Sequence, residues 1–394
     1  MEYKPLGSMV NRKIGYGIVQ PGQSVPDGVP VIKVNNLISG LKSPSELDTT
    51  ARENEAKYSR TRLHGGELIV SVVGTIGKTA IVPKSFAGCN LVRATALIDI
   101  EDELMSKWVK YYFDSPCGQS YIEQNLNTTV QPTLNIKSLV EMSIPIRNTT
   151  EMEKTVLLLS ALDEKIEVNR QINDNLEQQA QAIYHERFET VSPNDLPYDW
   201  RIVTLGEVVT ISNKSFNPLK EPEILLEHYS IPAFDEARFP VFELSTSIKS
   251  NKFIIDASCF MISKLNPTTK RVWKPYCLTE DAVCSTEFIV YKAKDQAITD
   301  FLYSVIDSGS FSDFMCSHVT GSTGSRQRTT PAETLSYKLI LPSENELAEF
   351  QSLVSPMYAQ MRINAIENDK LKRLRDSLLP KLMSGEIDVS AVQL

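Results

Sequence analysis

The feature that most constrains the fold of this chain is an internal repeat with an offset of about 195 residues. The segment "NDNLEQQAQAIYHERF" (173–188) aligns with "NDKLKRLRDSLLPKLM" (368–383). Further upstream, "QPTLNIKSLVEMSIPI" (131–146) resembles "QRTTPAETLSYKLILP" (327–342). A sequence that repeats itself in this way predicts two related globular domains, each followed by a similar helical segment.

The two aligned segments are predicted to be long helices. The stretch from Met152 to Phe188 lacks glycine and proline, and its apolar residues recur three and four positions apart, as in a heptad seam. Asparagines interrupt this seam at the same two places in each helix: Asn169, Asn173, Asn364 and Asn368. We expect these asparagines to set the register of an antiparallel coiled coil, at some cost in stability.

The repeat and the helices together predict an α+β chain with a pseudo-twofold axis. The expected parts are two α/β domains at 1–150 and 191–342, with long antiparallel coiled-coil helices at 151–190 and 343–394, the second ending in a C-terminal tail. The coiled coil separates the two domains in this arrangement.

A possible phosphate-binding loop lies in "SVVGTIGKTAIVP" (71–83). The full nucleotide-binding pattern needs a glycine five residues before Gly77, and that position is Val72. A β-branched residue does not adopt the open backbone angles that surround a phosphate, and the following "TAIVP" is typical of a strand and not of a helix. We therefore predict a β-hairpin that turns at Gly74–Gly77.

Composition excludes several classes of protein. The 394 residues carry a net charge of −8, although residues 1–150 alone carry +2, so an acidic chain can still present a basic face. No apolar run is long enough for a membrane span, and the N-terminus lacks a secretory signal. The six cysteines and four histidines lack metal-site spacing, so we expect no metal, free thiols and a cytoplasmic location.

Two enzyme classes can be tested against the sequence. A DNA methyltransferase needs an aromatic residue after an Asn-Pro element to clamp a flipped base, and neither Asn217 nor Asn266 is followed by one. A metal-dependent nuclease could use Asp27, Glu55 and Lys57, whose spacing suits a Pro-Asp…Glu-x-Lys pattern. Such short patterns are common by chance, so the sequence favours a non-catalytic protein.

Several of these segments resemble the specificity subunits of Type I restriction–modification systems. The resemblance is strongest in "LLLSALDEKIEVNRQINDNLEQQAQAIYHERF" (157–188) and "IENDKLKRLRDSLLPKLMSGEIDV" (366–389), which are similar to the helical regions of that family. "YGIVQPGQSVPDGVPVIKVNNL" (16–37) and "GTIGKTAIVPKSFAG" (74–88) are similar to its target-recognition domain. The second globular domain departs most, because it lacks a GTIG hairpin and carries "SKLNPTTKRVWKP" (263–275) at the comparable place.

The resemblance implies a subunit that reads a bipartite sequence in double-stranded DNA, with one half-site for each target-recognition domain. It also implies docking of two methyltransferase (modification) subunits and of motor-nuclease (restriction) subunits, with no membrane involved. S-adenosylmethionine, ATP and Mg²⁺ are then expected in the partner subunits and no cofactor in this chain. The competing interpretation is a coiled-coil interaction protein that binds no nucleic acid.

Basic and amide side chains suit contacts with phosphates and base edges, since arginine pairs with guanine, and asparagine or glutamine pairs with adenine. In the first domain the candidates are Lys33, Asn35, Asn36, Arg60, Arg62, Thr75, Lys78, Asn127, Thr128 and Gln131. In the second domain they are Lys264, Asn266, Thr269, Lys270, Arg271, Arg326, Gln327 and Arg328.

Overall fold

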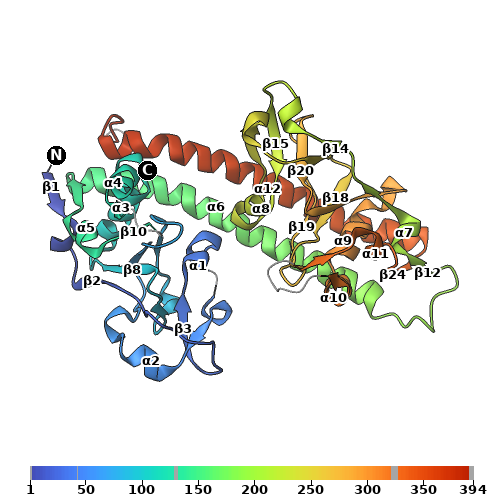
Figure 1. Ribbon diagram of the computed structural model, residues 1–394, viewed down its shortest axis with the longest axis horizontal. Helices are drawn as coiled ribbons and strands as arrows, with labels where there is room; N and C mark the ends of the chain where they lie inside the picture. Colours follow the sequence, from blue (N-terminus) through green and yellow to red (C-terminus); the bar gives the residue numbers. More distant parts are fainter. Residues whose placement is uncertain (1, 42, 128–131, 321–326, 390–394) are drawn as a thin grey trace. The chain divides into compact units, whose positions relative to one another are not determined.

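The structure is a computed structural model that describes residues 2–41, 43–127, 132–320 and 327–389. The chain forms two compact units: Met1–Lys165 together with Lys370–Leu394, and Ile166–Asp369. The long helices are α6 (Thr149–Tyr184) and α12 (Glu344–Ser384), and each of them has one part in the first unit and the other part in the second unit (Figure 1). Within the described ranges, no helix is long and apolar enough to cross a membrane.

The first unit is built on a four-stranded antiparallel sheet with the strand order β2-β8-β5-β6. A second sheet has the order β4-β3-β7, in which β3 and β7 are parallel. Two short pairs complete the unit, β1 with β11 and β9 with β10. The strands are β1 (Glu2–Pro5), β2 (Arg12–Tyr16), β3 (Val29–Ile32), β4 (Thr49–Thr50), β5 (Leu68–Ser71), β6 (Thr79–Ile81), β7 (Asn90–Leu91), β8 (Thr95–Asp99), β9 (Leu126–Asn127), β10 (Thr133–Leu134) and β11 (Ser143–Ile146).

The helix α3 lies at the centre of the first unit. Its side chains Trp108 and Phe113 are fully buried and belong to one core with Val70 of the sheet, Leu159 of α6 and Leu382 of α12. The helix begins where the Asp102 carboxylate accepts a hydrogen bond from the Met105 amide at 3.2 Å. The helices of this unit besides α6 and α12 are α1 (Val34–Ser39), α2 (Arg52–Ala56), α3 (Glu103–Asp114), α4 (Pro116–Gln124) and α5 (Ile136–Glu141).

The second unit repeats this plan. Its four-stranded antiparallel sheet has the order β13-β21-β18-β19, and a larger mixed sheet has the order β14-β17-β20-β15-β16. The pairs β12 with β24 and β22 with β23 correspond to the two short pairs of the first unit. The strands are β12 (Arg201–Thr204), β13 (Val209–Ser212), β14 (Ser215–Phe216), β15 (Leu225–Tyr229), β16 (Val241–Leu244), β17 (Lys252–Ile254), β18 (Cys259–Ser263), β19 (Val272–Trp273), β20 (Ala282–Ser285), β21 (Phe288–Ala293), β22 (Val319–Thr320), β23 (Arg328–Thr329) and β24 (Lys338–Leu341).

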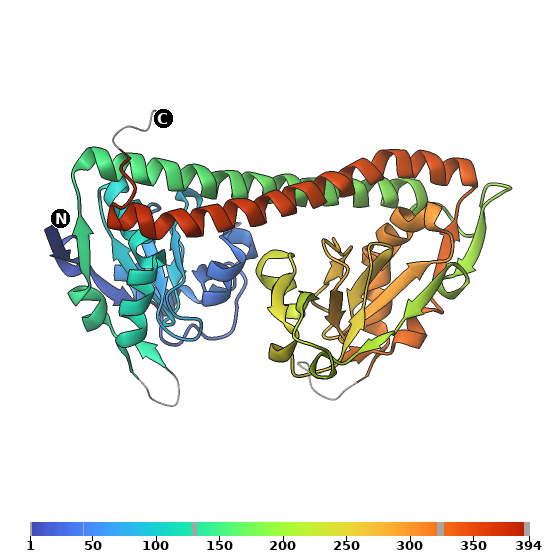
Figure 2. The ribbon, with the colours of Figure 1, turned by 90° about the horizontal axis from the view of Figure 1, so that it is seen from above.

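The core of the second unit also joins a sheet to shorter helices, α9 among them, and to both long helices. Phe301 of α9 is fully buried in one cluster with Tyr291 of the sheet, Tyr184 of α6 and Phe350 of α12. The shorter helices here are α7 (Leu205–Val208), α8 (Ile231–Ala237), α9 (Thr299–Ile306), α10 (Gly309–Ser317) and α11 (Pro331–Thr334). In each unit, the parts of α6 and α12 that belong to it lie side by side along one edge (Figure 2).

The α+β architecture and the internal repeat that the sequence predicts are thus present in the structure. The strongest sign of the repeat is the strand order, because β2-β8-β5-β6 and β13-β21-β18-β19 are the same arrangement of equivalent strands. In both units a central strand of the sheet forms a hairpin with the edge strand that follows it in sequence. These two hairpins contain many of the candidate residues.

Candidate nucleic-acid interface

The hairpin of the first unit joins β5 to β6, with Leu68 opposite Ile81 and Val70 opposite Thr79. Its turn uses two glycines with positive φ, Gly74 at 80° and Gly77 at 84°, where a side chain would strain the backbone. This is the hairpin predicted from the sequence, and Val72 is fully buried within it. The phosphate-loop interpretation is therefore not supported.

Ser71 holds the tip of this hairpin from inside. Its hydroxyl donates to the Thr75 carbonyl at 2.6 Å and accepts from the Lys78 amide at 2.8 Å, while its carbonyl accepts from the Gly77 amide at 2.9 Å. With the backbone bonded internally, the side chains of Thr75 and Lys78 remain exposed. That these two side chains contact a phosphate stays a prediction.

The second unit has a hairpin at the same place, formed by β18 and β19 with Ile262 opposite Val272. The sequence lacks the GTIG motif here, and the topology shows that a hairpin forms at this place without it. Asn266 takes the positive φ, 48°, that glycines supply in the first unit. Asparagine tolerates this left-handed conformation better than other non-glycine residues, so the turn forms without the GTIG sequence.

A second loop supports this turn. The Asn266 amide donates to the Gln327 carbonyl at 2.9 Å, and the Thr269 amide donates to the Asn266 carbonyl at 2.8 Å. Lys264 and Gln327 are half-buried and Thr269 is exposed. The structure thus brings the candidates at 264–271 next to those that begin at Gln327.

Several predicted DNA-contacting cations are ion-paired within the chain. In the first unit, Lys33 lies 2.5 Å from Asp48, and Arg62 lies 2.5 Å from the buried Glu55. The hydrogen bond from Arg62 lowers the pKa of Glu55, although burial opposes this shift, and a bond from Asn90 adds to it. Such cations must exchange partners before they can contact a phosphate.

The same holds for the second unit. Nitrogen–oxygen distances are 2.8 Å from Lys270 to Asp307, 2.5 Å from Arg271 to Asp235 and 3.0 Å from Arg328 to Glu287. Arg328 donates to both carboxylate oxygens of Glu287, through Nε and Nη2, at 3.0 Å each. This forked geometry orients the guanidinium at the start of β23.

Other candidates are exposed. The side chains of Arg60 and Asn127 face solvent, as does that of Asn35. Asn36 has a structural role, because its Oδ1 accepts the Lys33 amide at 2.8 Å at the start of α1. Thr128, Gln131 and Arg326 lie outside the described residues.

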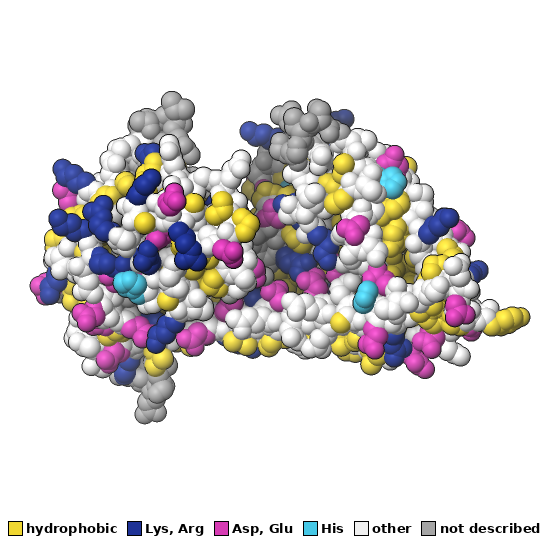
Figure 3. All heavy atoms as spheres, turned by 90° about the horizontal axis from the view of Figure 1, so that it is seen from below, with side chains coloured by type: hydrophobic (Ala, Val, Ile, Leu, Met, Phe, Trp, Pro, Cys, Tyr) yellow, Lys and Arg dark blue, Asp and Glu magenta, His cyan; other side chains and the backbone are white. Residues whose placement is uncertain are grey.

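Sequence reasoning did not place four further cations of the first unit among the DNA-contact candidates: Lys13, Arg52, Lys57 and Arg93. Each is exposed, and within the described parts of the chain none of the four forms an ion pair. Figure 3 shows Lys and Arg side chains gathered on the visible face of this unit. The net charge of +2 in residues 1–150 indicated an excess of basic residues without identifying them.

The structure does not favour the nuclease alternative, because one of its two candidate carboxylates, Glu55, is bonded within the chain. Glu55 is bonded to Arg62 and Asn90, whereas Lys57 is exposed and Asp27 lies in a turn with φ of 56°. Among the residues that the structure describes, no three His, Cys, Asp or Glu side chains are grouped to hold a metal ion.

The four asparagines meet across the helix pair in the second unit. Asn169 Nδ2 donates to Asn368 Oδ1 at 2.9 Å, and Asn364 Nδ2 donates to Asn173 Oδ1 at 2.8 Å. Asn169 and Asn364 are buried, which makes an unpaired amide costly at this seam.

Comparisons with known proteins find a matching domain and several similar proteins. Residues 2–178 match the family described as Type I restriction modification DNA specificity domain. The chain is 27% identical over 175 residues to the EcoBI specificity subunit of Escherichia coli, covering 43% of this chain but only 37% of that protein. It is 24% identical over 318 residues to the MjaIX specificity subunit of Methanocaldococcus jannaschii, covering 73% of this chain and 71% of the relative.

A solved structure has the same fold along nearly the whole chain. The Type I restriction–modification S subunit from M. genitalium aligns with a TM-score of 0.53 and 16% identity, over 97% of this chain and 95% of that one. Residues 2–178 thus match a Type I restriction modification DNA specificity domain, and over 73% of its length the chain is similar to a Type I specificity subunit.

Proposed function

We propose that this chain reads a bipartite sequence in double-stranded DNA, with each unit contacting one half-site. The observation that carries the proposal is the repeated sheet, which presents a hairpin at the same position in both units. On this proposal the target-recognition domains are residues 1–150 and 191–342, and the spacer helices are 151–190 and 343–394.

The two units are proposed to hold DNA differently. Lys78, Arg60, Lys13 and Lys57 of the first unit are exposed and lack ion pairs within the described residues, so they can neutralise phosphates at no cost in broken contacts. In the second unit, Lys270, Arg271 and Arg328 must leave or share a carboxylate first. Such sharing favours an oriented contact with a base edge over a general attraction to the backbone.

The helix pair is proposed to dock two modification subunits. Exposed apolar side chains are found on its outer surface, and Val168 (48% exposed) and Ile363 (57% exposed) are separated by the repeat offset of 195 residues. A surface that repeats itself suits two copies of one partner. Methyl transfer, with S-adenosylmethionine, and ATP-driven restriction with Mg²⁺ would then take place in partner subunits, in the cytoplasm where host DNA lies.

The test is to map methylation in a bacterial strain that lacks its own adenine methyltransferases. The strain would carry this chain together with a Type I modification subunit from the same genome, and long-read sequencing would detect the modified adenines. We expect one motif with two specific half-sites and an unread gap, and no methylation when either protein is absent. A continuous motif, or methylation by the modification subunit alone with the same motif, would contradict the proposal.

The comparisons do not favour the alternative, a coiled-coil interaction protein without nucleic acid, and DNA binding tests it directly. It predicts that the full chain, assembled with its modification subunits, binds duplex DNA no better than the modification subunits do. Fluorescence anisotropy with a labelled duplex in low salt distinguishes the two, because phosphate contacts weaken steeply with salt.

A further inference from the structure

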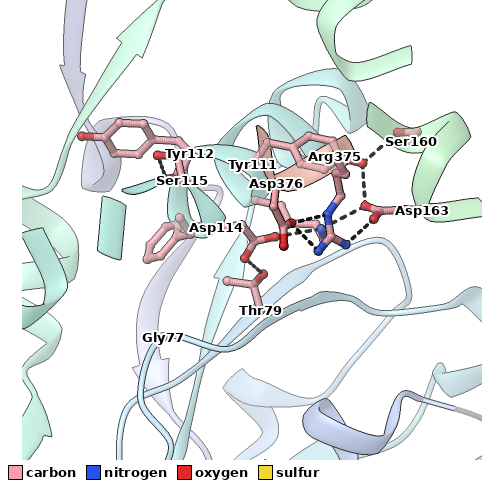
Figure 4. A network of polar contacts seen from close by, with 12 residues as sticks. Gly77, Thr79, Tyr111, Tyr112, Asp114, Ser115, Ser160, Asp163, Arg375 and Asp376 are labelled. Carbon is pink, nitrogen blue, oxygen red and sulfur yellow. Dashed lines mark hydrogen bonds and ion pairs between the residues drawn. The ribbon is translucent and has the colours of Figure 1, made fainter. Parts of the chain in front are cut away.

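A chain of charged contacts runs through the first unit from the recognition hairpin to both long helices (Figure 4). It begins at Thr79 of β6, whose hydroxyl donates to Asp114 Oδ1 at 2.6 Å. The other carboxylate oxygen of Asp114 lies 2.9 Å from the Lys110 ammonium, one turn earlier on α3. Lys110 lies 3.5 Å from Asp163 Oδ2 on α6, and Asp163 Oδ1 accepts from Arg375 of α12 at 2.7 Å.

The charges at the centre of this chain depend on one another. Burial disfavours the ammonium of Lys110, yet the carboxylates of Asp114 and Asp163 outweigh it and raise the pKa of Lys110. Burial likewise disfavours the Asp163 carboxylate, but Lys110 and Arg375 together lower its pKa. Removing either cation would leave a carboxylate partly buried without its compensating charge.

Two further side chains, Gln119 and Tyr111, connect the hairpin, α3 and α6. Gln119 of α4 donates to the Gly77 carbonyl in the hairpin turn at 3.3 Å and to the Phe113 carbonyl at 2.7 Å. The Tyr111 hydroxyl donates to Asp163 Oδ2 at 2.9 Å and lies 3.3 Å from the Ser160 hydroxyl. The hairpin therefore contacts the end of α3 once directly and once through Gln119 of α4, and α3 contacts α6 through two neighbouring side chains.

The second unit has the same connection with different side chains. Asp307 occupies the position of Asp114 and forms an ion pair with the hairpin residue Lys270, which stands in place of Thr79 and also donates to the Asp307 backbone carbonyl at 2.7 Å. Ser304 occupies the position of Tyr111, and its hydroxyl lies 2.8 Å from that of Tyr358, which is offset from Asp163 by 195 residues. Since the geometry recurs while the residue types differ, the recurring property is the link from hairpin to helix.

We propose that Lys110, Asp163 and Arg375 are positioning residues that hold the first unit's recognition hairpin in a fixed orientation on the helix pair. On this proposal, reading of the first half-site depends on Arg375, a residue 296 positions away from Thr79 in sequence. The proposal rests on the proposed function for the reading of DNA, but the link itself is a property of the chain alone.

The first measurement needs no DNA. Hydrogen exchange in the full chain would follow the Gly77 and Lys78 amides, which are bonded to Ser71. In Lys110→Met and Arg375→Gln we expect these amides to exchange about tenfold faster, with no change in the hairpin of the second unit. Lys107→Met is the matched control, because Lys107 lies on the same helix and, among the residues that the structure describes, its one ion pair is with Glu103, at 2.8 Å. Arg375→Lys should restore slow exchange in part.

A double-mutant cycle separates a link from two independent effects. Thr79→Val keeps the shape of the strand side chain but removes the hydrogen bond to Asp114. If the network connects Arg375 to the hairpin, Arg375→Gln should accelerate exchange of the Gly77 and Lys78 amides less in the Thr79→Val variant than in the original chain. Additive effects, or equal acceleration in both hairpins, would overturn the proposal. Thr79→Val and Arg375→Lys keep the test decisive if Lys110→Met does not fold.

The second measurement uses methylation mapping of the assembled complex. Arg375→Gln should make the first half-site degenerate, lowering its discrimination about three- to tenfold, while the second half-site stays sharp. If the original chain yields no bipartite motif, the proposed function fails and the exchange data still decide the link. If the motif is bipartite and Arg375→Gln leaves both half-sites intact, only the positioning role fails.

Discussion

Asn173 and Asn364 face each other across the helix pair, and the Asn364 amide donates to the Asn173 carbonyl oxygen at 2.8 Å. Shifted by the repeat offset, this contact becomes the one between Asn368 and Asn169, at 2.9 Å. The remaining amide protons follow the same symmetry, since Asn173 donates to the carbonyl of Met361 and Asn368 donates to that of Ile166. Any slipped register would separate these groups and bury them unpaired, so the network selects one alignment.

Replacing one asparagine of a facing pair should cost more than replacing both. We expect Asn364→Leu to destabilise the chain by about 1–3 kcal/mol, because the Asn173 carbonyl oxygen loses its donor at a buried seam. The double variant Asn173→Leu/Asn364→Leu should recover much of this loss through apolar packing. Chemical denaturation of the three variants would measure this, and additive costs would show that the two amides act independently.

Lys78→Ala should weaken DNA binding to the same degree for all sequences. The side chain is exposed at the hairpin tip, where a cation contacts a phosphate without reading a base. The slope of log affinity against log salt should fall by about one. Binding isotherms at several salt concentrations test this, with Lys107→Ala as the control from the same unit. A change in the recognised motif would instead assign Lys78 to base reading.

Arg328→Lys should affect only the second half-site. Lysine keeps the positive charge but cannot reproduce the forked contact that Glu287 orients through two hydrogen bonds. A lost bidentate contact with a guanine costs about 1–3 kcal/mol of discrimination at one position. The methylation motif would show a single relaxed base there. Relaxation in the first half-site would contradict the assignment of one half-site to each unit.

Asp307→Asn should change how stability depends on pH. Burial, followed by the nearby Glu177 carboxylate, raises the pKa of Asp307 from 3.8 to about 6, although Lys270 opposes this shift. The folded chain therefore binds the proton of the Asp307 carboxyl group more tightly than the unfolded chain does. The contribution of this protonation to the stability of the fold is fully present below pH 3.8, and it is lost as the pH rises through about 6.

An asparagine at this position does not titrate. Relative to the original chain, Asp307→Asn should therefore gain stability as the pH rises from about 4 to 7, by on the order of 3 kcal/mol at most. Thermal melts across this range would measure the gain, and Asp281→Asn, at an exposed carboxylate of the same unit, is the control. A stability difference between the two chains that does not vary with pH would show that folding does not raise the pKa of Asp307.

Sequence reasoning succeeded where the signal is local or repeated. Heptad spacing and the recurrence of Asn169 and Asn173 predicted the helices, and Gly74 with Gly77 predicted the first hairpin. It missed the second hairpin because Asn266 replaces a glycine, a substitution visible only from the backbone angle of 48°. It also could not predict that Arg328 pairs with Glu287, because the two residues are 41 positions apart in sequence.

The link to Arg375 could not be predicted for the same reason. Asp163 and Arg375 are 212 residues apart, and nothing in either local segment marks them as partners. Only the antiparallel packing of α6 on α12 within the first unit brings them together. Side-chain roles that depend on such distant pairing require the structure, whereas the fold class does not.

The last prediction concerns the helices as a spacer. Both α6 and α12 run from one unit into the other, so lengthening both by one heptad keeps the apolar seam continuous. The register of the asparagine pairs places the matching insertion points after Ala180 in α6 and between Pro356 and Met357 in α12. Ala180 and Met357 indeed belong to the same core cluster. These positions leave all four asparagines facing their present partners.

Seven residues add about 10 Å of helix, which corresponds to about three base pairs of B-DNA at 3.4 Å each. If the helices set the spacing, methylation mapping of the double insertion should give the same half-sites separated by a gap about three base pairs longer. Affinity should fall, since three base pairs change the phase of the groove by roughly a third of a turn. A four-residue insertion at both sites is the control, because it moves the apolar stripe off the seam and should abolish methylation. Full methylation with the original gap in the seven-residue variant would show that the spacing is set elsewhere in the chain.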